Sequence, residues 1–247
     1  INSFSGTGKI SVVSAGNSGS DNIHYSNSIA AGNYIDVTVT VPAYTASSGT
    51  FNDYFFLDTW FDDNSSVNIT ITSPNNITTT QNANGSTSNQ TNDGTVFIDN
   101  HIDVNNNDRE IDIQIYDADA SKPPKNGDWK FRFTNTSGSN VFFHTWLAVY
   151  SLGSATPVLT NVNSNYTLGN DAESSLIVGS YVSKWRWESS LGSFYSYSGT
   201  DRSDNISSFS SKGPTRDGRQ KPDISAPGQG LGSSRSKDGT FTSSTIL

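Results

Sequence analysis

Apolar and polar residues alternate in several short runs in the middle of the chain, and this pattern restricts the possible folds more than any other feature. Three of the clearest runs are residues 34–41, 67–72 and 110–116. A period of two puts every second side chain on one face, as in a β-strand that buries one face and exposes the other. Further candidates are residues 53–61, 95–99, 129–135 and 141–150. Seven or eight short antiparallel strands within about 135 residues predict a sandwich or jelly roll.

Two segments near the ends of the chain carry motifs of a different kind. Residues 9–19 read Lys-Ile-Ser-Val-Val-Ser-Ala-Gly-Asn-Ser-Gly, an apolar strand that runs into a turn of small residues. Residues 207–228 read Ser-Ser-Phe-Ser-Ser-Lys-Gly-Pro-Thr-Arg-Asp-Gly-Arg-Gln-Lys-Pro-Asp-Ile-Ser-Ala-Pro-Gly. The prolines of this run restrict the backbone of Lys221 and Ala226, because a residue before proline is pushed out of the helical region. We expect its charged residues to form a local ion-pair network: Arg216, Asp217, Arg219, Lys221 and Asp223.

In order and residue type, the two segments resemble those of the subtilisin-like serine proteases, the subtilases of peptidase family S8. The resemblance implies an endopeptidase that hydrolyses peptide bonds of a polypeptide substrate by a Ser-His-Asp mechanism. It also implies that Asn17 supplies the amide of the oxyanion hole. By the same resemblance, Ser14, Ala15 and Gly16 wall the pocket for a substrate side chain, and Gly169 forms its floor.

The motifs that carry the catalytic Asp, His and Ser of subtilases are not found in this sequence. The Asp and His motifs should precede Asn17, which only sixteen residues precede, and the serine motif should follow Gly228 by a short strand and loop. Residues 239–241, Gly-Thr-Phe, lie too close after Gly228 and lack the expected proline. We therefore expect the triad on remaining segments of the same protease, and an inactive isolated chain. The histidines stand beside no such motif and are predicted to be structural or surface residues: His24, His101 and His144.

The spacing of the motifs predicts an insertion. In subtilases a short connection joins the Asn turn to the next buried parallel strand, whose best match here is residues 176–181. Val178 follows Asn17 by 161 positions, which is the length of a domain. We expect an α/β subtilisin-like parallel sheet, partial and discontinuous, with an inserted all-β antiparallel sandwich or jelly roll. The predicted parts are a first core segment at 1–20, the insert at 21–156 and a second core segment at 157–247.

Carboxylates in the insert suggest calcium. The acidic residues concerned lie near an Asn-Asn-Asn run and are Asp99, Asp103, Asp108, Asp112, Asp117, Asp119 and Asp128. Hard oxygen ligands suit Ca²⁺, but residues 103–114 lack the Gly and final Glu of an EF-hand loop. Residues 126–133 and 144–149 resemble strands of the P-domain type of jelly roll, and subtilases and P-domains often carry calcium. We expect calcium without assigning its ligands, and a solvated acidic loop is the alternative.

Composition disfavours several classes of partner. The formal net charge is −8, from 15 Lys and Arg against 23 Asp and Glu, which argues against nucleic acid and anionic membranes. No run approaches the eighteen or so apolar residues of a membrane span. The chain has no cysteine, so no disulfide framework or thiol site is available. Abundant Asn, Ser, Thr and Gly with only 15% charged residues are common in secreted β-proteins, and we expect an extracellular or cell-surface location.

Two alternatives to an active protease stay open. In the first, the sandwich is a module that binds protein or glycan through aromatic residues such as Trp60, Trp129 and Trp146. Burial in the core is the commoner role of such side chains. In the second, the whole protein is an inactive scaffold in which a triad residue is replaced in the flanking segments.

Overall fold

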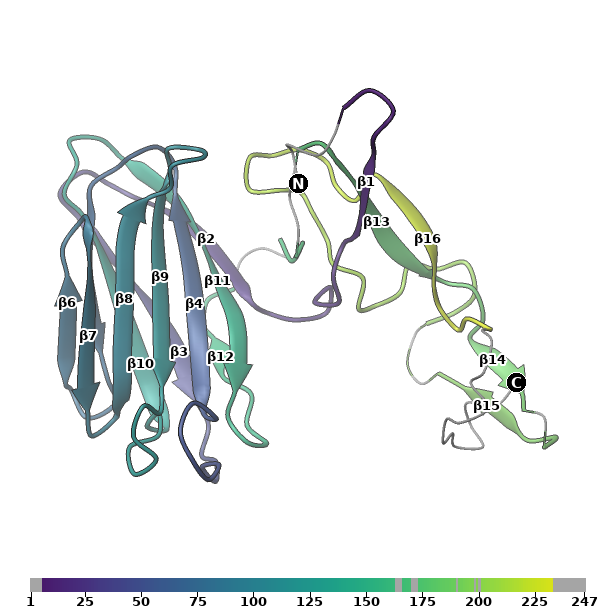
Figure 1. Cartoon of the computed structure of the whole chain (residues 1–247), viewed down its shortest axis with the longest axis horizontal. Helices are drawn as coiled ribbons and strands as arrows, with labels where there is room; N and C mark the ends of the chain where they lie inside the picture. The colour runs from purple at the N-terminus through teal and green to yellow at the C-terminus, as the bar shows by residue number, and fades with distance from the viewer. Residues whose placement is uncertain are drawn as a thin grey trace. The chain divides into compact units, whose positions relative to one another are not determined.

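The computed structural model describes residues 6–162, 166–169, 173–189, 191–197, 199 and 201–232. The chain divides into two compact units. The flanking unit combines Ile1–Asp21 with Asn165–Leu247, and the sandwich unit is Asn22–Ser164. Figure 1 shows the strands of both units.

Two antiparallel sheets form the sandwich unit. The five-stranded sheet has the order β12-β3-β10-β5-β6, with β12 at Val158–Leu159, β3 at Tyr34–Val41, β10 at Gly127–Asn135, β5 at Val67–Thr72 and β6 at Thr78–Gln81. The six-stranded sheet has the order β2-β11-β4-β9-β8-β7, with β2 at His24–Ile29, β11 at Val141–Ser151, β4 at Tyr54–Phe61, β9 at Arg109–Tyr116, β8 at Gly94–Ile102 and β7 at Gly85–Thr91.

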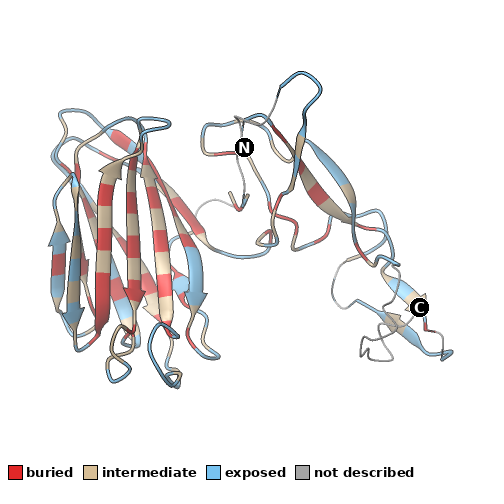
Figure 2. Cartoon of the chain, viewed as in Figure 1, coloured by how far each residue is buried: buried red, intermediate tan, exposed pale blue. Residues whose placement is uncertain are grey.

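Side chains from both sheets meet in one hydrophobic core, which accounts for the alternating sequence. Along β9, each second residue is buried and those between are partly exposed, and Figure 2 shows this alternation as bands along the strands. Phe55 of β4 packs against Trp129 of β10 with ring centroids 5.8 Å apart, and Phe61 against Phe133 at 5.6 Å. Buried aromatic rings of this size dominate the stability of such cores.

A three-stranded parallel sheet organises the flanking unit. Its order is β1-β13-β16, with β1 at Ser11–Ser14, β13 at Ser175–Val182 and β16 at Ile224–Gln229. Val13 pairs with Ile177 and Ser14 with Val178, so β1 lies beside the apolar strand within residues 176–181 despite the long interruption in the sequence. A small hairpin of β14 (Arg186–Glu188) and β15 (Phe194–Ser196) lies between β13 and β16 in the sequence.

The predicted α/β subtilisin-like fold is wrong for the residues that the structure describes. They contain no helix, and the two large sheets are antiparallel. Helices of an α/β layer come from the crossovers between parallel strands. Here the crossover from β1 to β13 contains the sandwich, and the described part of the crossover from β13 to β16 is a hairpin and loops rich in Ser, Gly and Pro. At β1, moreover, Val12 is 61% exposed, so this strand is not buried on both faces.

No helix among these residues has the length and apolar character of a membrane span.

Candidate functional site

A tight turn follows β1 at residues 15–19, and we call it the Asn17 turn. Gly16 has a φ of +106°, a backbone conformation that residues with a Cβ rarely adopt. A Cβ at this position would lie 2.8 Å from Ser211 Oγ. Both the backbone angle and the lack of space therefore require glycine before Asn17, whose own side chain is exposed.

Backbone hydrogen bonds fix the start of the turn. The N–H of Ala15 donates to the carbonyl of Val178 on β13 at 2.9 Å. The carbonyl of Ala15 in turn accepts from the N–H of Gly169 at 2.9 Å. The parallel sheet and the Gly169 segment thus hold Ala15 from two directions, and Ala15 is only 1% exposed.

Residues 209–211 hold the other side of the turn. The N–H of Ser211 donates to the carbonyl of Gly16 at 3.0 Å, and Ser211 Oγ accepts from the N–H of Ser18 at 3.0 Å. The N–H of Gly19 donates to the carbonyl of Phe209 at 2.8 Å. Asn17 therefore stands between two neighbours whose backbones are both anchored to the same segment.

The structure brings the predicted pocket residues together. Gly169 meets Ala15 through their hydrogen bond, and Ser14, Ala15 and Gly16 lead directly into Asn17. Ser14 is exposed and Gly16 half-buried, whereas Ala15 is buried, so the side chain of Ala15 does not reach the surface. Their roles toward a substrate stay predictions.

Sequence reasoning missed Ser211 as a residue of this site. Residues 209 and 211, near the start of the motif at 207–228, bind to the Asn17 turn. Residue type gives no signal here, because Ser211 lies among other serines in the sequence.

Further hydrogen bonds join the motif at 207–228 to β13. Asp223 Oδ2 accepts from the N–H of Ile177 at 2.7 Å, and the N–H of Asp223 donates to the carbonyl of Ile177 at 2.9 Å. Lys221 Nζ lies 2.7 Å from Asp223 Oδ2 and 3.0 Å from the carbonyl oxygen of Ser175. The hydrogen bond from Lys221 lowers the pKa of Asp223, and that from Ile177 adds to it. Of the predicted ion-pair network, the structure gives this pair and Arg219–Asp217 at 2.8 Å.

All three histidines belong to the sandwich unit. His24 Nε2 and His144 Nδ1 are 2.9 Å apart, and both residues are buried. His101 Nε2 lies 3.3 Å from Glu110 Oε2, and His101 Nδ1 lies 3.4 Å from Asp99 Oδ2. Asn17, by contrast, belongs to the flanking unit.

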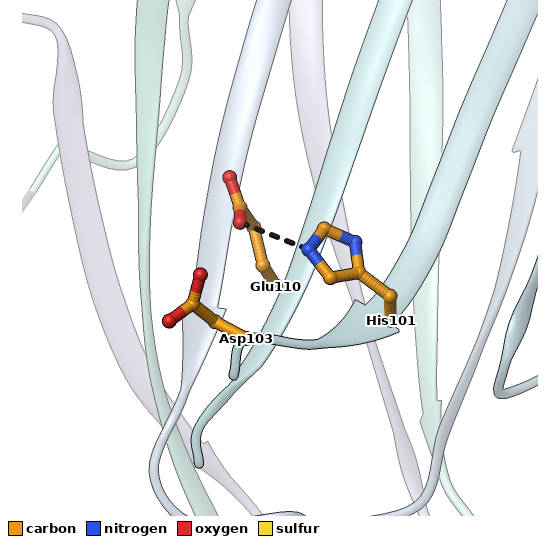
Figure 3. Close-up of side chains that lie close together, drawn as sticks. All are labelled: His101, Asp103 and Glu110. Atoms are coloured by element: carbon orange, nitrogen blue, oxygen red, sulfur yellow. Dashed lines mark ion pairs between the residues drawn. The ribbon is translucent and has the colours of Figure 1, made fainter. Parts of the chain in front are cut away.

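His101, Asp103 and Glu110 form a group of possible metal ligands, with donor atoms within 4.8 Å of one another (Figure 3). Burial, followed by the charge of Asp58, raises the pKa of Glu110 to about 7. The hydrogen bond from the Asn105 backbone lowers the pKa of Asp103, which keeps this carboxylate ionised at neutral pH. The expectation of calcium named no ligands, and nothing in this group tests it.

Comparison with known proteins gives a consistent family assignment. The model of the subtilase family matches residues 2–245. A Dictyostelium discoideum protein described as "Serine protease/ABC transporter B family protein tagD" is 66% identical over 38 residues, which are 15% of this chain and 2% of that protein.

The solved structure of the Clostridium perfringens CspB protease has a similar fold. It matches 96% of this chain with a TM-score of 0.57 and 18% sequence identity. The match covers 46% of the CspB protease chain, so the present chain spans about half the length of that protein and a small part of the Dictyostelium one.

Proposed function

The chain belongs to the subtilase family, and from this premise we propose that it is part of a secreted subtilisin-like endopeptidase in which Asn17 stabilises the oxyanion. The substrate would be a polypeptide. Ser14, Ala15, Gly16 and Gly169 would line the pocket beside the scissile bond, with Ala15 contributing only its backbone because its side chain is buried.

The observation that carries this proposal is the anchoring of the Asn17 turn on both sides of an exposed Asn. When a nucleophile attacks a peptide carbonyl, negative charge develops on the oxygen. An amide donor stabilises this charge best when it is already in place, because no energy is then spent on reorganisation during the reaction. The hydrogen bonds of Gly16 and Ser18 to Ser211 supply that fixed backbone.

We propose further that the nucleophilic Ser, the His base and its Asp come from remaining segments of the same protease. A triad needs an imidazole beside the nucleophile. The three histidines of this chain belong to the sandwich unit, where His24 contacts His144 and His101 contacts acidic residues.

The binding-module alternative loses one of its proposed contacts. Trp129 is completely buried between the two sheets, with its ring against Phe55, and is therefore a core residue. No described feature favours this alternative over the protease.

The test is Asn17→Ala in the intact protease that contains this chain. We expect kcat to fall by about 10²–10³, the magnitude known for loss of such a donor in a subtilisin, with little change in KM. Asn205→Ala is the matched control, since Asn205 is an exposed Asn of the same unit. A normal kcat with a raised KM would instead assign Asn17 to ground-state binding and refute the proposal.

A further inference from the structure

The hairpin formed by β8 and β9 places three possible metal ligands at one end. His101 on β8 and Glu110 on β9 are directly opposite in the antiparallel register, and Asp103 begins the turn between the strands. The N–H of Asp103 donates to the carbonyl of Asp108 at 2.8 Å, and the N–H of Asn107 donates to that of Asp103 at 2.9 Å. The turn is thus closed by its own backbone, and Figure 3 shows the three side chains gathered beside it.

The distances between the donor atoms of these three side chains are close to those between the ligand atoms of a bound zinc ion. Bonds of about 2.0–2.2 Å to a tetrahedral Zn²⁺ place its donor atoms roughly 3.3–3.6 Å from one another. His101 Nε2 and Glu110 Oε2 are 3.3 Å apart. The carboxylate of Asp103 lies within 4.8 Å of both, so it would have to approach by roughly an ångström, which is within the reach of side-chain rotation.

The second nitrogen of His101 lies close to a carboxylate, although it makes no hydrogen bond to it. Its Nδ1 lies 3.4 Å from Asp99 Oδ2. Metal-binding histidines almost always donate the N–H of the other ring nitrogen to a carboxylate or carbonyl oxygen, which fixes the tautomer and raises the basicity of the ligand atom. A small rotation of the imidazole ring would direct Nδ1–H at Asp99 and leave the lone pair of Nε2 available to the metal.

An adjacent row of like charges independently indicates a cation. Asp99, Asp112 and Asp58 are paired directly across the three neighbouring strands β8, β9 and β4. Carboxylates directly opposite each other destabilise a sheet. A bound divalent cation next to this row would offset more of that repulsion than the single charge of a protonated histidine.

We propose that His101, Asp103 and Glu110 bind one divalent transition-metal ion, of which Zn²⁺ is the best suited. An imidazole nitrogen with two carboxylates is a typical ligand set for Zn²⁺. Ca²⁺ would instead take six to eight oxygen ligands. Three protein ligands leave a fourth position for water or for a donor atom of another molecule.

The test is zinc binding to the purified 247-residue chain, measured by isothermal titration calorimetry, with Co²⁺ as a spectroscopic probe. We expect one Zn²⁺ per chain and the absorption bands of tetrahedral Co²⁺. His101→Gln and Glu110→Gln should each weaken binding at least tenfold. Asp119→Asn is the control, because Asp119 is an acidic residue of the same unit that pairs with Lys122. Circular dichroism melts without metal verify that every variant is folded.

Three results would overturn the proposal. The first is a wild-type chain without stoichiometric Zn²⁺. The second is Zn²⁺ binding that persists undiminished in folded His101→Gln, which would assign the ion elsewhere, for example to the buried pair His24 and His144. The third is displacement of Zn²⁺ by Ca²⁺ at equal concentration, which would indicate an oxygen-only site.

Discussion

Gly16 is the glycine of the Asn17 turn that combines a positive φ with a lack of space for a side chain. Its φ of +106° and the 2.8 Å between a would-be Cβ and Ser211 Oγ oppose any side chain. Gly16→Ala should therefore destabilise the folded chain by about 1–3 kcal/mol, the usual cost of such backbone strain. It should also lower kcat. A shift of the backbone at position 16 would displace the neighbouring Asn17, whose side chain is the proposed oxyanion donor.

Chemical denaturation of the 247-residue chain and kinetics of the intact protease measure the two effects. Gly6→Ala is the control, because Gly6 has open space where a Cβ would stand. Equal stability of both variants would show that the turn is not confined as described.

Ser211 is a positioning residue for Asn17. Ser211→Ala removes the acceptor of the Ser18 N–H but keeps the backbone bond to Gly16. We expect a stability loss of about 1 kcal/mol and a kcat that falls while KM stays near normal. Ser211→Thr keeps the hydroxyl and should recover kcat if it is folded. Failure of this rescue, or an unchanged kcat in Ser211→Ala, would remove Ser211 from the site.

The Asn17 turn could be predicted because its residue types match a motif of the subtilases, and two of these residue types have a physical reason. Only glycine tolerates the angle at position 16, and only a side chain with an amide N–H offers the proposed donor at 17. Ser211 could not be found this way. Its contribution is one hydroxyl acceptor at a long sequence separation, and any of several nearby serines could have supplied it.

At the scale of elements, one cross-strand ion pair gives the sandwich a pH-dependent contribution. Arg132 on β10 faces Asp36 on β3, with Nε 2.7 Å from Oδ1 and Nη2 2.8 Å from Oδ2. The hydrogen bond from Arg132 lowers the pKa of Asp36 in the folded chain. The ion pair therefore stabilises the fold fully at a pH above the ordinary aspartate pKa. This stabilisation is lost as the pH falls through the lowered pKa of Asp36 in the folded chain.

Arg132→Gln should therefore destabilise the chain at pH 7 by up to about 1 kcal/mol, since both groups are partly exposed. The difference from wild type should shrink below about pH 4. Lys130→Gln removes the same charge from the same strand and should have a smaller effect. Urea denaturation from pH 7 to 3 provides the comparison. A pH-independent difference would attribute the effect to packing of Arg132 on Tyr34, whose ring centroid lies 3.9 Å from its guanidinium carbon.

Strands with alternating apolar residues could be predicted, but others could not. β6 and β7 have the sequences Thr-Thr-Thr-Gln and Gly-Ser-Thr-Ser-Asn-Gln-Thr, in which no apolar side chain marks a buried face. Each lies at the edge of its sheet and is defined mainly by backbone pairing. The α/β prediction, in contrast, assumed helices that the described residues do not contain. Apolar runs at β1 and β13 indicate parallel strands but do not specify which elements cover them.

For the whole molecule, we predict that the 247-residue chain alone does not hydrolyse peptides. A site that stabilises an oxyanion has no effect without a nucleophile to create one. The measurement is turnover of a generic peptide substrate by rigorously purified chain. Activity that a serine-directed phosphonate inhibits would contradict the prediction and require a nucleophile within this sequence.

The sandwich unit should fold without the rest of the chain, because its two sheets share one closed core. The predicted insert ends at residue 156, but β12 at Val158–Leu159 pairs with β3, and Leu159 is only 2% exposed. A segment of residues 22–162 should therefore melt cooperatively and be more stable than 22–156 by about 1.5–3 kcal/mol, the value of burying one leucine. Circular dichroism melts compare the two, with Leu159→Ala in the longer segment as the matched variant. If 22–162 stays unfolded, the core requires the flanking unit. If both segments are equally stable, β12 is a peripheral strand that adds nothing to the core.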